Sequence, residues 1–433
     1  MAESRPFARS PIFMTSYKQD SAETPDVPPS ANPPLAAGTQ GPARALIAAV
    51  SGYAMDGFDL LILGFMLNLI SADLGLTSSQ AGSLVTWTLT GGVVGGVGFG
   101  ILSDYIGRVR VLTYTILLFA LFTGLCALAT GYSDLLVYRF IAGVGLGGEF
   151  GIGMALAIEA WPANQRGRVS SYVGMGWQLG VLAAAIVTPL LLPHIGWRGM
   201  FLVGLFPAVG SFIIRKAIGE SELFVRTHAA KKREFPIKTL FRDRATTKHS
   251  IGVIILCSVQ NFGYYGLIVW MPAYLSKMFG YTLTRSAIWT GSSIIGMLAG
   301  IWIFGQLADR IGRKPAFVGY QVGALVMVFV YSTLSTPSAL LIGGIFMGLF
   351  VNGMMGGYGA LMAELYPTHA RGTAQNVLWS IGRAVGGFGP LAIGALATHY
   401  SFGTAIALLA SIYIIDLLAT LFLIPELRGV PLE

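Results

Sequence analysis

The chain has 433 residues, of which 54% are hydrophobic and only 11% are charged. Water-soluble domains carry about 25% charged residues, so this chain has too few charges to cover its own surface in water. The net charge is +8, but the basic residues fall in short gaps between apolar runs. That pattern is typical of the cytoplasmic loops of membrane proteins and argues against a nucleic-acid partner. We therefore predict an all-α integral membrane protein whose solvent is the lipid bilayer.

The first 42 residues differ from the rest of the chain. They are rich in Pro, Ser and Ala, contain no apolar core and show no cleavable signal peptide. We predict a disordered cytoplasmic tail over residues 1–42, with Met14 as an alternative start to Met1. The two cysteines, Cys126 and Cys257, lie inside apolar runs without metal-ligand spacing. We therefore expect no metal ion and no cofactor.

Twelve apolar runs follow, each near the roughly 20 residues that a helix needs to cross a bilayer. The polar segment 219–249 divides them six and six. We predict an N-terminal six-helix bundle over 43–218, a basic cytoplasmic linker over 219–249, a C-terminal six-helix bundle over 250–424 and a short cytoplasmic tail over 425–433. The predicted spans are 43–70, 78–103, 109–130, 133–160, 167–192, 198–218, 250–276, 284–308, 314–334, 337–365, 371–397 and 401–424.

The basic residues also predict the orientation in the membrane. Ten of them lie between Arg215 and Lys248, whereas only Arg198, Lys277 and Arg285 fall near the opposite face. Because Lys and Arg are enriched in cytoplasmic loops, the linker is predicted to be cytoplasmic. An even number of spans then places both termini in the cytoplasm. We expect the protein to lie in the inner (plasma) membrane.

The two halves repeat at a constant offset. The second span ends in Gly-Ile-Leu-Ser-Asp104-Tyr-Ile-Gly-Arg108, and the eighth ends in Gly-Gln-Leu-Ala-Asp309-Arg-Ile-Gly-Arg313, so that 309 − 104 = 205. Glu159 and Glu364 end the fourth and tenth spans at the same offset, 364 − 159 = 205. Six spans per half make the copies parallel in the bilayer. Parallel repeats of this kind are found in secondary transporters, where the binding site lies between the halves.

These motifs resemble those of the major facilitator superfamily. The loop motif G-x-x-x-D-R-x-G-R-R/K matches closely at 305–314 and with substitutions at 100–110, and the resemblance extends over about 43–424. It implies two parallel-repeat six-helix bundles that alternate between inward and outward access. It also implies a transporter that is not an enzyme and that functions as a monomer.

Within that superfamily, two subgroups are resembled. The run Asp56-Gly-Phe-Asp59 is similar to the signature of aromatic acid/proton symporters, whose functional positions correspond here to Asp104, Arg139, Arg371 and Arg383 as well. The runs Gly-Gly-Glu149-Phe and Glu159-Ala-Trp-Pro look more like the sialate and monocarboxylate symporters. The resemblance implies a small organic acid and protons as the transported partners, and leaves the acid open.

Three buried carboxylates are candidates for proton coupling: Asp56, Asp59 and Glu149. Asp56 lies about 20 Å into the first span, and a three-residue spacing places Asp59 on the same helix face. Two carboxylates in an apolar medium repel and lose hydration, which favours a protonated form of one of them. The alternatives are an ion pair between helices for the aspartates and a hydrogen-bonded packing role for Glu149.

Two arginines inside spans are candidates for binding the acid. Arg139 breaks the repeat, because residue 344 (139 + 205) is Gly344. Its alternative role is an ion pair with Asp59 or Asp134. Arg383 lies one turn after Trp379, an arrangement suited to a planar acid. Its alternative role is an interhelical bond to Asp416.

Further polar and aromatic side chains are weaker candidates for the substrate site. They lie in the seventh and fifth spans, where polar groups also serve simply to hold helices together. They are Gln260, Asn261, Tyr264, Trp177 and Gln178.

Eight charged residues at the cytoplasmic ends of spans are predicted to act in gating. Opposite charges at such positions can pair in one state of a two-state transition and separate in the other. They are Asp104, Arg108, Glu159 and Arg166 in the first half and Asp309, Arg313, Glu364 and Arg371 in the second.

These features predict proton-coupled uptake (symport) of a small organic acid. The alternative is a drug or metabolite/proton antiporter that exports its substrate. Exporters of this superfamily usually carry G-P-x-x-G-G in the fifth span, and residues 169–192 lack it. A membrane sensor or an enzyme is a third possibility, but no catalytic constellation or appended soluble domain supports it.

Overall fold

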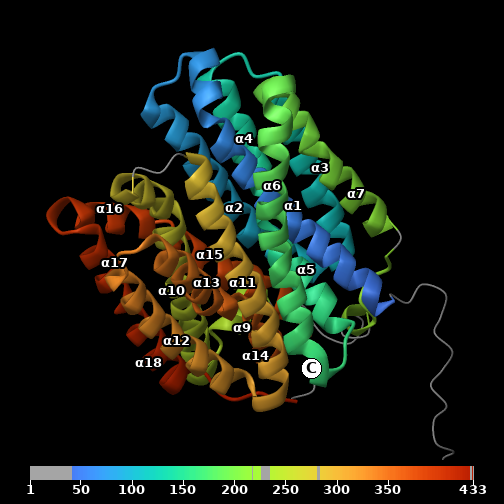
Figure 1. Ribbon diagram of the computed structural model, residues 1–433. Coiled ribbons are helices and arrows are strands. Elements are labelled where there is room, and N and C mark those ends of the chain that lie inside the picture. The colour runs from blue at the N-terminus through green and yellow to red at the C-terminus, as the bar shows by residue number, and fades with distance from the viewer. Residues whose placement is uncertain (1–40, 217, 226–234, 280–282, 430–431, 433) are drawn as a thin grey trace, which may run out of the picture. The chain divides into compact units, whose positions relative to one another are not determined.

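The computed structural model describes residues 41–216, 218–225, 235–279, 283–429 and 432. The described residues include only the last two of the predicted N-terminal tail. Parts of the predicted linker and of the predicted C-terminal tail also lie outside the described residues. Regular structure in the described part of the chain is entirely helical (Figure 1).

The helices of the first half correspond to the first six predicted spans. They are α1 (Pro42–Leu74), α2 (Ser78–Ile106), α3 (Arg108–Cys126), α4 (Tyr132–Gly147), α5 (Glu149–Glu159), α6 (Arg166–Val203) and α7 (Leu205–Lys216), with a short 3-10 helix, η1 (Ala163–Gln165), before α6.

The helices of the second half correspond to the last six predicted spans. They are α9 (Pro236–Leu240), α10 (Arg244–Phe279), α11 (Leu283–Ile311), α12 (Arg313–Thr333), α13 (Pro337–Gly353), α14 (Tyr358–Leu365), α15 (Thr368–Gly386), α16 (Gly389–His399), α17 (Phe402–Ala410) and α18 (Ile412–Leu423), with a 3-10 helix, η2 (Met354–Gly356), between α13 and α14.

Eleven helical stretches of the described residues are long and apolar enough to cross a membrane. One of them, 163–203, contains the predicted fifth span and the beginning of the predicted sixth. The two parts meet at a kink at Gly196, where φ is 65°. A positive φ is readily adopted by glycine because it lacks a Cβ. The remainder of the sixth span is α7, which at 12 residues is too short to count alone. The predicted fifth and sixth spans are therefore both present.

Four predicted continuous spans are interrupted in the structure. The span 133–160 is divided into α4 and α5 at Gly148, and 337–365 is divided by η2. The spans 371–397 and 401–424 each form two helices as well, α15 with α16 and α17 with α18. Glycine weakens a helix interior, and glycines stand at three of these four breaks, which explains why hydropathy alone predicted unbroken helices.

Glycine contacts between helices repeat in the two halves. A Cβ built on Gly91 of α2 would lie 2.1 Å from the carbonyl oxygen of Phe140 on α4, and one on Gly296 of α11 would lie 2.0 Å from that of Ile345 on α13. The offsets are 296 − 91 = 205 and 345 − 140 = 205. The sequence repeat is therefore also a repeat of backbone-to-backbone packing, of the kind that small residues permit between membrane helices.

The two halves meet along two helix pairs. α2 of the first half packs against α15 of the second, and α6 of the first packs against α11 of the second. Figure 1 shows the first half in blue to green beside the second half in yellow to red. This interface between the halves carries the pocket and the charged residues considered below.

The glycine contacts predict a strong dependence of folding on side-chain size at Gly95. A Cβ there would lie 1.9 Å from the carbonyl oxygen of Val144, whereas one on Gly98 of the same helix meets nothing within 4 Å. We expect Gly95→Val to destabilise the protein by about 3 kcal/mol or more, because helix backbones must separate. Gly98→Val is the matched control and should leave thermal unfolding in detergent nearly unchanged. Equal melting temperatures for the two variants would contradict this packing.

Candidate functional site

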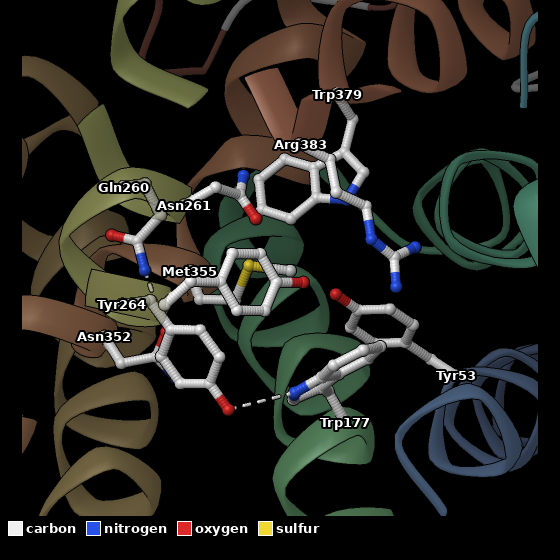
Figure 2. Close-up of a pocket in the computed structure, with 10 residues that line it drawn as sticks. Tyr53, Trp177, Gln260, Asn261, Tyr264, Asn352, Met355, Trp379 and Arg383 are labelled. Carbon is white, nitrogen blue, oxygen red and sulfur yellow. Dashed lines mark hydrogen bonds between the residues drawn. The ribbon is translucent and has the colours of Figure 1, made fainter. Parts of the chain in front are cut away.

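A pocket lies between the two halves of the protein (Figure 2). Its cavity volume is about 20 Å³ in this state, which is room for about one water molecule, so the lining side chains lie close together. The lining comes from α1, α6, α10, α13, η2 and α15. The lining residues are Tyr53, Trp177, Gln260, Asn261, Tyr264, Tyr265, Asn352, Met355, Trp379 and Arg383.

Hydrogen bonds hold part of the lining in place. Gln260 Nε2 donates to Asn352 Oδ1 at 2.8 Å, and Trp177 Nε1 donates to Tyr264 Oη at 3.3 Å (Figure 2). The second bond joins α6 of the first half to α10 of the second. Asn261 Nδ2 instead donates to the carbonyl oxygen of Cys257, one turn earlier on its own helix. The side-chain oxygen and the second N–H of this Asn261 amide therefore remain for a ligand.

Aromatic rings surround the pocket on several sides. The Tyr53 and Trp177 ring centroids are 5.4 Å apart, and Phe150 links Tyr53 at 4.8 Å to Trp379 at 4.7 Å. Aromatic side chains provide flat apolar surface with little conformational freedom to lose on binding. The pocket is thus suited to a planar or partly apolar ligand.

Arg383 is the cationic side chain in the pocket lining. Its guanidinium carbon lies 5.2 Å from the centre of the Trp177 ring. Our expectation paired Arg383 with Trp379, one turn earlier, but the ring beneath it belongs to the opposite half. Arg383 also interacts electrostatically with Asp56, Tyr53 and Tyr265. Because the side chain is only partly buried, its donors remain within reach of an anion in the pocket.

Asp59 forms a fully buried ion pair with Arg139 inside the first half. Arg139 Nη2 lies 2.6 Å from Asp59 Oδ2, Nη1 lies 3.1 Å from Oδ1, and Nε donates to Thr88 Oγ1 at 3.2 Å. The bidentate geometry is the strong form of this interaction. The two residues, predicted for proton coupling and substrate binding, lie outside the pocket lining in this state. This is the interhelical ion pair that the sequence left open as an alternative.

Asp56 lies closer to the pocket than Asp59 does. Its side chain is 2% exposed, and it interacts electrostatically with both Arg383 and Tyr53. The interaction with Arg383 crosses from α1 to α15, and hence from one half to the other. Of the two predicted aspartates, Asp56 is therefore the one that interacts with the cationic side chain of the pocket.

Glu149 begins α5, directly after the break at Gly148. It is buried, and Thr115 Oγ1 donates to its Oε1 at 2.6 Å. Since Glu149 does not line the pocket, the arrangement resembles the packing alternative more than a direct role in ligand binding.

A first charge cluster joins the halves at the predicted cytoplasmic end. It consists of Asp104, Arg108, Glu159 and Arg371. Arg108 lies 3.1 Å from Asp104 and 3.2 Å from Glu159, and Arg371 of the second half lies 2.9 Å from Glu159. Asp104 also accepts hydrogen bonds from the backbone amides of Gly372 and Thr373 at 3.2 and 2.7 Å. The cluster therefore holds the start of α15 against α2.

A second charge cluster repeats this arrangement with the halves exchanged. It consists of Asp309, Arg313, Glu364 and Arg166. Arg313 lies 2.9 Å from Asp309 and 2.8 Å from Glu364, and Arg166 of the first half lies 3.9 Å from Glu364. Asp309 accepts hydrogen bonds from Gly167 and Arg168 at the start of α6, where backbone amides lack helical partners. All eight residues predicted to act in gating thus lie in two clusters at this end that join the halves.

Two further carboxylates support the charge clusters. Glu220, in the predicted linker, accepts a hydrogen bond from the backbone amide of Val109 at 3.1 Å. Burial raises the pKa of the Glu220 carboxyl, and the nearby Arg108 guanidinium opposes that rise. Glu426 accepts bonds from the amides of Arg313 and Lys314 at 3.0 and 2.9 Å in the second half. Neither glutamate is among the residues predicted from the sequence to form a site.

Other lining residues were also missed from the sequence. Tyr53 lies three residues before Asp56 and hence on the same helix face. This spacing could have identified Tyr53 as a residue of the site. Asn352 is a polar residue within an apolar run, which is a similar signal. No sequence pattern indicated that Met355 would line the pocket, because its position depends on the 3-10 turn η2. Conversely, Gln178 lies behind the lining, fully buried and in contact with Tyr264.

Two helical bundles joined at a membrane-embedded interface, with a pocket between them and charge clusters at one end, define a membrane transporter. The sequence profile of the Major Facilitator Superfamily matches residues 49–319 and 286–432. The chain belongs to this superfamily, as its motifs predicted, and the predicted class of twelve spanning helices in two parallel six-helix bundles is confirmed.

Related proteins agree with a transporter of metabolites. The chain is 63% identical over 399 residues to a Haemophilus influenzae protein provisionally named a metabolite transport protein, covering 90% of this chain and 98% of the relative. It is 29% identical over 366 residues to a sialic acid transporter of Escherichia coli, covering 84% and 89% respectively.

A solved structure shares the fold. The proton:xylose symporter bound to 6-bromo-6-deoxy-D-glucose superposes with a TM-score of 0.73 at 19% identity, covering 90% of this chain and 97% of that one. At this identity the likeness establishes the fold.

The buried ion pair predicts a large effect of removing one partner. Asp59→Leu leaves Arg139 charged and unpaired in an apolar interior, so we expect a loss of about 3–5 kcal/mol in stability. The double variant Asp59→Leu with Arg139→Leu removes both charges and should recover most of that loss. Thermal unfolding of purified protein in detergent measures both. A double variant no more stable than the single one would show that the pairing is not the source of the effect.

The charge clusters predict that their loss opens the predicted cytoplasmic end. We expect the double variant Glu159→Gln with Glu364→Gln to expose the interface between α6 and η2, where Ser171 Oγ donates to the carbonyl oxygen of Gly356 at 3.3 Å. Ser171→Cys should then react with a maleimide several-fold faster in that background. The native cysteines, both buried, supply the baseline. An unchanged rate would argue against a gating role for the clusters.

Proposed function

We propose that the protein imports a small organic acid together with protons across the inner membrane, by alternating access of the pocket to the two sides. The observation that supports this most is Arg383, a cationic side chain in an aromatic-lined pocket between the halves, with Asp56 beside it. An arginine fork and flat apolar walls suit a carboxylate attached to a planar or compact body.

The proximity of Asp56 to Arg383 supplies a physical route to coupling. An ionised Asp56 competes with the acid for the guanidinium, whereas a protonated Asp56 leaves the guanidinium available. Binding of the acid and binding of a proton therefore favour each other, and by linkage the effect is reciprocal. Without substrate, Arg383 is positive and Asp56 is negative, so their net charge is zero. With substrate and proton bound, Arg383 is positive, Asp56 is neutral and the substrate carboxylate is negative, so the net charge is again zero. An apolar interior then never holds an uncompensated charge.

The two charge clusters support access to the pocket from the opposite face in this state. With the predicted cytoplasmic end held by ion pairs and backbone hydrogen bonds, ligand exchange from the pocket would take place toward the opposite face. Loading of acid and proton from outside, followed by separation of the clusters, completes an inward step. The small change needed is a rocking of the halves along the α2–α15 and α6–α11 contacts.

The chemical class of the substrate is narrowed by the lining. The relative from Escherichia coli is named for sialic acid, and the motif at Asp56 and Asp59 resembles that of aromatic acid symporters. A monocarboxylate with a ring or a hydroxylated body fits both the single arginine and the amides of Gln260 and Asn352. A thermal-shift screen of benzoates, sialate, lactate and dicarboxylates at two pH values identifies the acid, with the largest stabilisation expected for the substrate at the lower pH.

The coupling scheme predicts a division of roles between two variants. In proteoliposomes with an inward proton gradient, Asp56→Asn should abolish accumulation of the acid while retaining substrate exchange, because its neutral amide mimics the loaded state. Arg383→Lys keeps the charge but loses the fork, so we expect about ten- to a hundredfold weaker binding. Gradient-driven accumulation that survives Asp56→Asn removes this residue from coupling. Outward flux under the same gradient would indicate an exporter.

A further inference from the structure

A further buried carboxylate lies outside the pocket lining, in the last helix. Asp416 is fully buried, and neither of its carboxyl oxygens has a hydrogen-bond partner of normal geometry in the described structure. Among the ion pairs of the described residues, none includes Asp416, and the bond to Arg383 considered from the sequence does not form. An ionised carboxylate without a counter-ion is strongly disfavoured in such a place, whereas the neutral acid is tolerated.

The side chains around Asp416 are polar but carry no positive charge. Gln321 of α12 interacts with the carboxyl, as do Cys257 of α10 and Tyr358 of α14. On its own helix, Tyr413 lies one turn earlier with a buried hydroxyl that also lacks a partner, and Thr420 lies one turn later. Gln321 Nε2 donates to Thr420 Oγ1 at 2.6 Å, and Gln321 Oε1 has no partner among the described residues. These groups can accept or relay a proton, but none can balance a carboxylate charge.

The position of Asp416 connects it to one of the charge clusters. The carboxyl lies seven residues before Leu423, about 10 Å from the end of α18 at 1.5 Å per residue. Beyond that end, Glu426 binds the amides that begin α12, and Lys314 Nζ donates to the carbonyl oxygen of Leu421. The two helices that enclose Asp416 are therefore tied together where Arg313 enters the second charge cluster.

The corresponding helix of the first half has no such group. α7, with the sequence LFPAVGSFIIRK, contains no acidic residue. Packing of the repeated fold thus does not require a carboxylate here, and the group is an addition specific to the second half.

We propose that Asp416 is a second proton-binding site of the transporter, loaded in the state described here. Its proton comes from the outer solution and leaves to the cytoplasm after the second charge cluster separates from the start of α6 and water reaches the second half from that side. A transport cycle then moves one proton more than Asp56 alone accounts for. The link to the cycle rests on the proposed function, whereas the protonated state of Asp416 does not.

Infrared spectroscopy of the reconstituted full-length protein tests the proposal without any substrate. A protonated carboxyl gives a C=O stretching band that a carboxylate lacks. We expect wild-type protein at pH 7 to show such a band, and Asp416→Asn to lose it while melting near the wild-type temperature, because asparagine resembles the neutral acid. Asp416→Glu should keep the band at a shifted frequency. This second variant tests the same assignment if Asp416→Asn folds poorly. Other buried carboxyls such as Asp56 can add to the band, so the test is the loss of one component of it. A band of unchanged intensity in Asp416→Asn overturns the proposal.

A second measurement separates a transported proton from a permanently bound one. In the Glu159→Gln, Glu364→Gln background, the Asp416 band should lose most of its intensity at pH 7. Asp243→Asn, at an exposed carboxylate bonded to Thr246, is the control and should leave the band unchanged. Full intensity in the opened background means that the proton never leaves, and this also overturns the proposal. Failure of acid transport in proteoliposomes would refute the proposed function and leave these spectra interpretable.

Discussion

The structure depends on one constraint, which is that every charge inside the apolar bundles must be balanced by an opposite charge or by a proton. The molecule meets this constraint in several ways. Arg139 and Asp59 form a closed bidentate pair within one half. Arg383 and Asp56 attract each other across the interface, next to a pocket. Asp416 has polar but uncharged neighbours. The first arrangement favours a fixed structure, whereas the other two leave room for an exchange of protons.

The same constraint explains the design of the closed end. Each charge cluster places an arginine between two carboxylates and adds backbone amides from the opposite half. These bonds form between helix ends rather than at the bilayer centre. Hydration can replace a lost partner at a helix end, so charges are less costly to place there than in the middle of a span. The repeat supplies two copies of this device, so the halves are held at two points.

Much of the architecture could be predicted from the sequence, because lipid imposes a simple length and polarity rule on helices. The constant offset of 205 between the motifs also placed all eight gating candidates at one end. Their actual partners were not predictable. Glu159 pairs with Arg371, and Arg383 packs on Trp177, because of the way in which the two halves pack against each other. The sequence of either half does not indicate that packing. The breaks at Gly148 and η2, which shape the neighbourhood of the pocket, likewise escaped a hydropathy argument.

The glycines of α2 that face α15 carry a further consequence. A Cβ on Gly96 would lie 2.2 Å from Ser380 Oγ, and one on Gly100 would lie 2.7 Å from the Cβ of Asn376. The Ser380 and Asn376 side chains of α15 occupy the space that a Cβ on α2 would take, so the two helices approach each other closely here. A single methyl group at either glycine would push α2 and α15 apart. The space that α2 leaves for these side chains therefore sets how closely the two halves can approach along this contact.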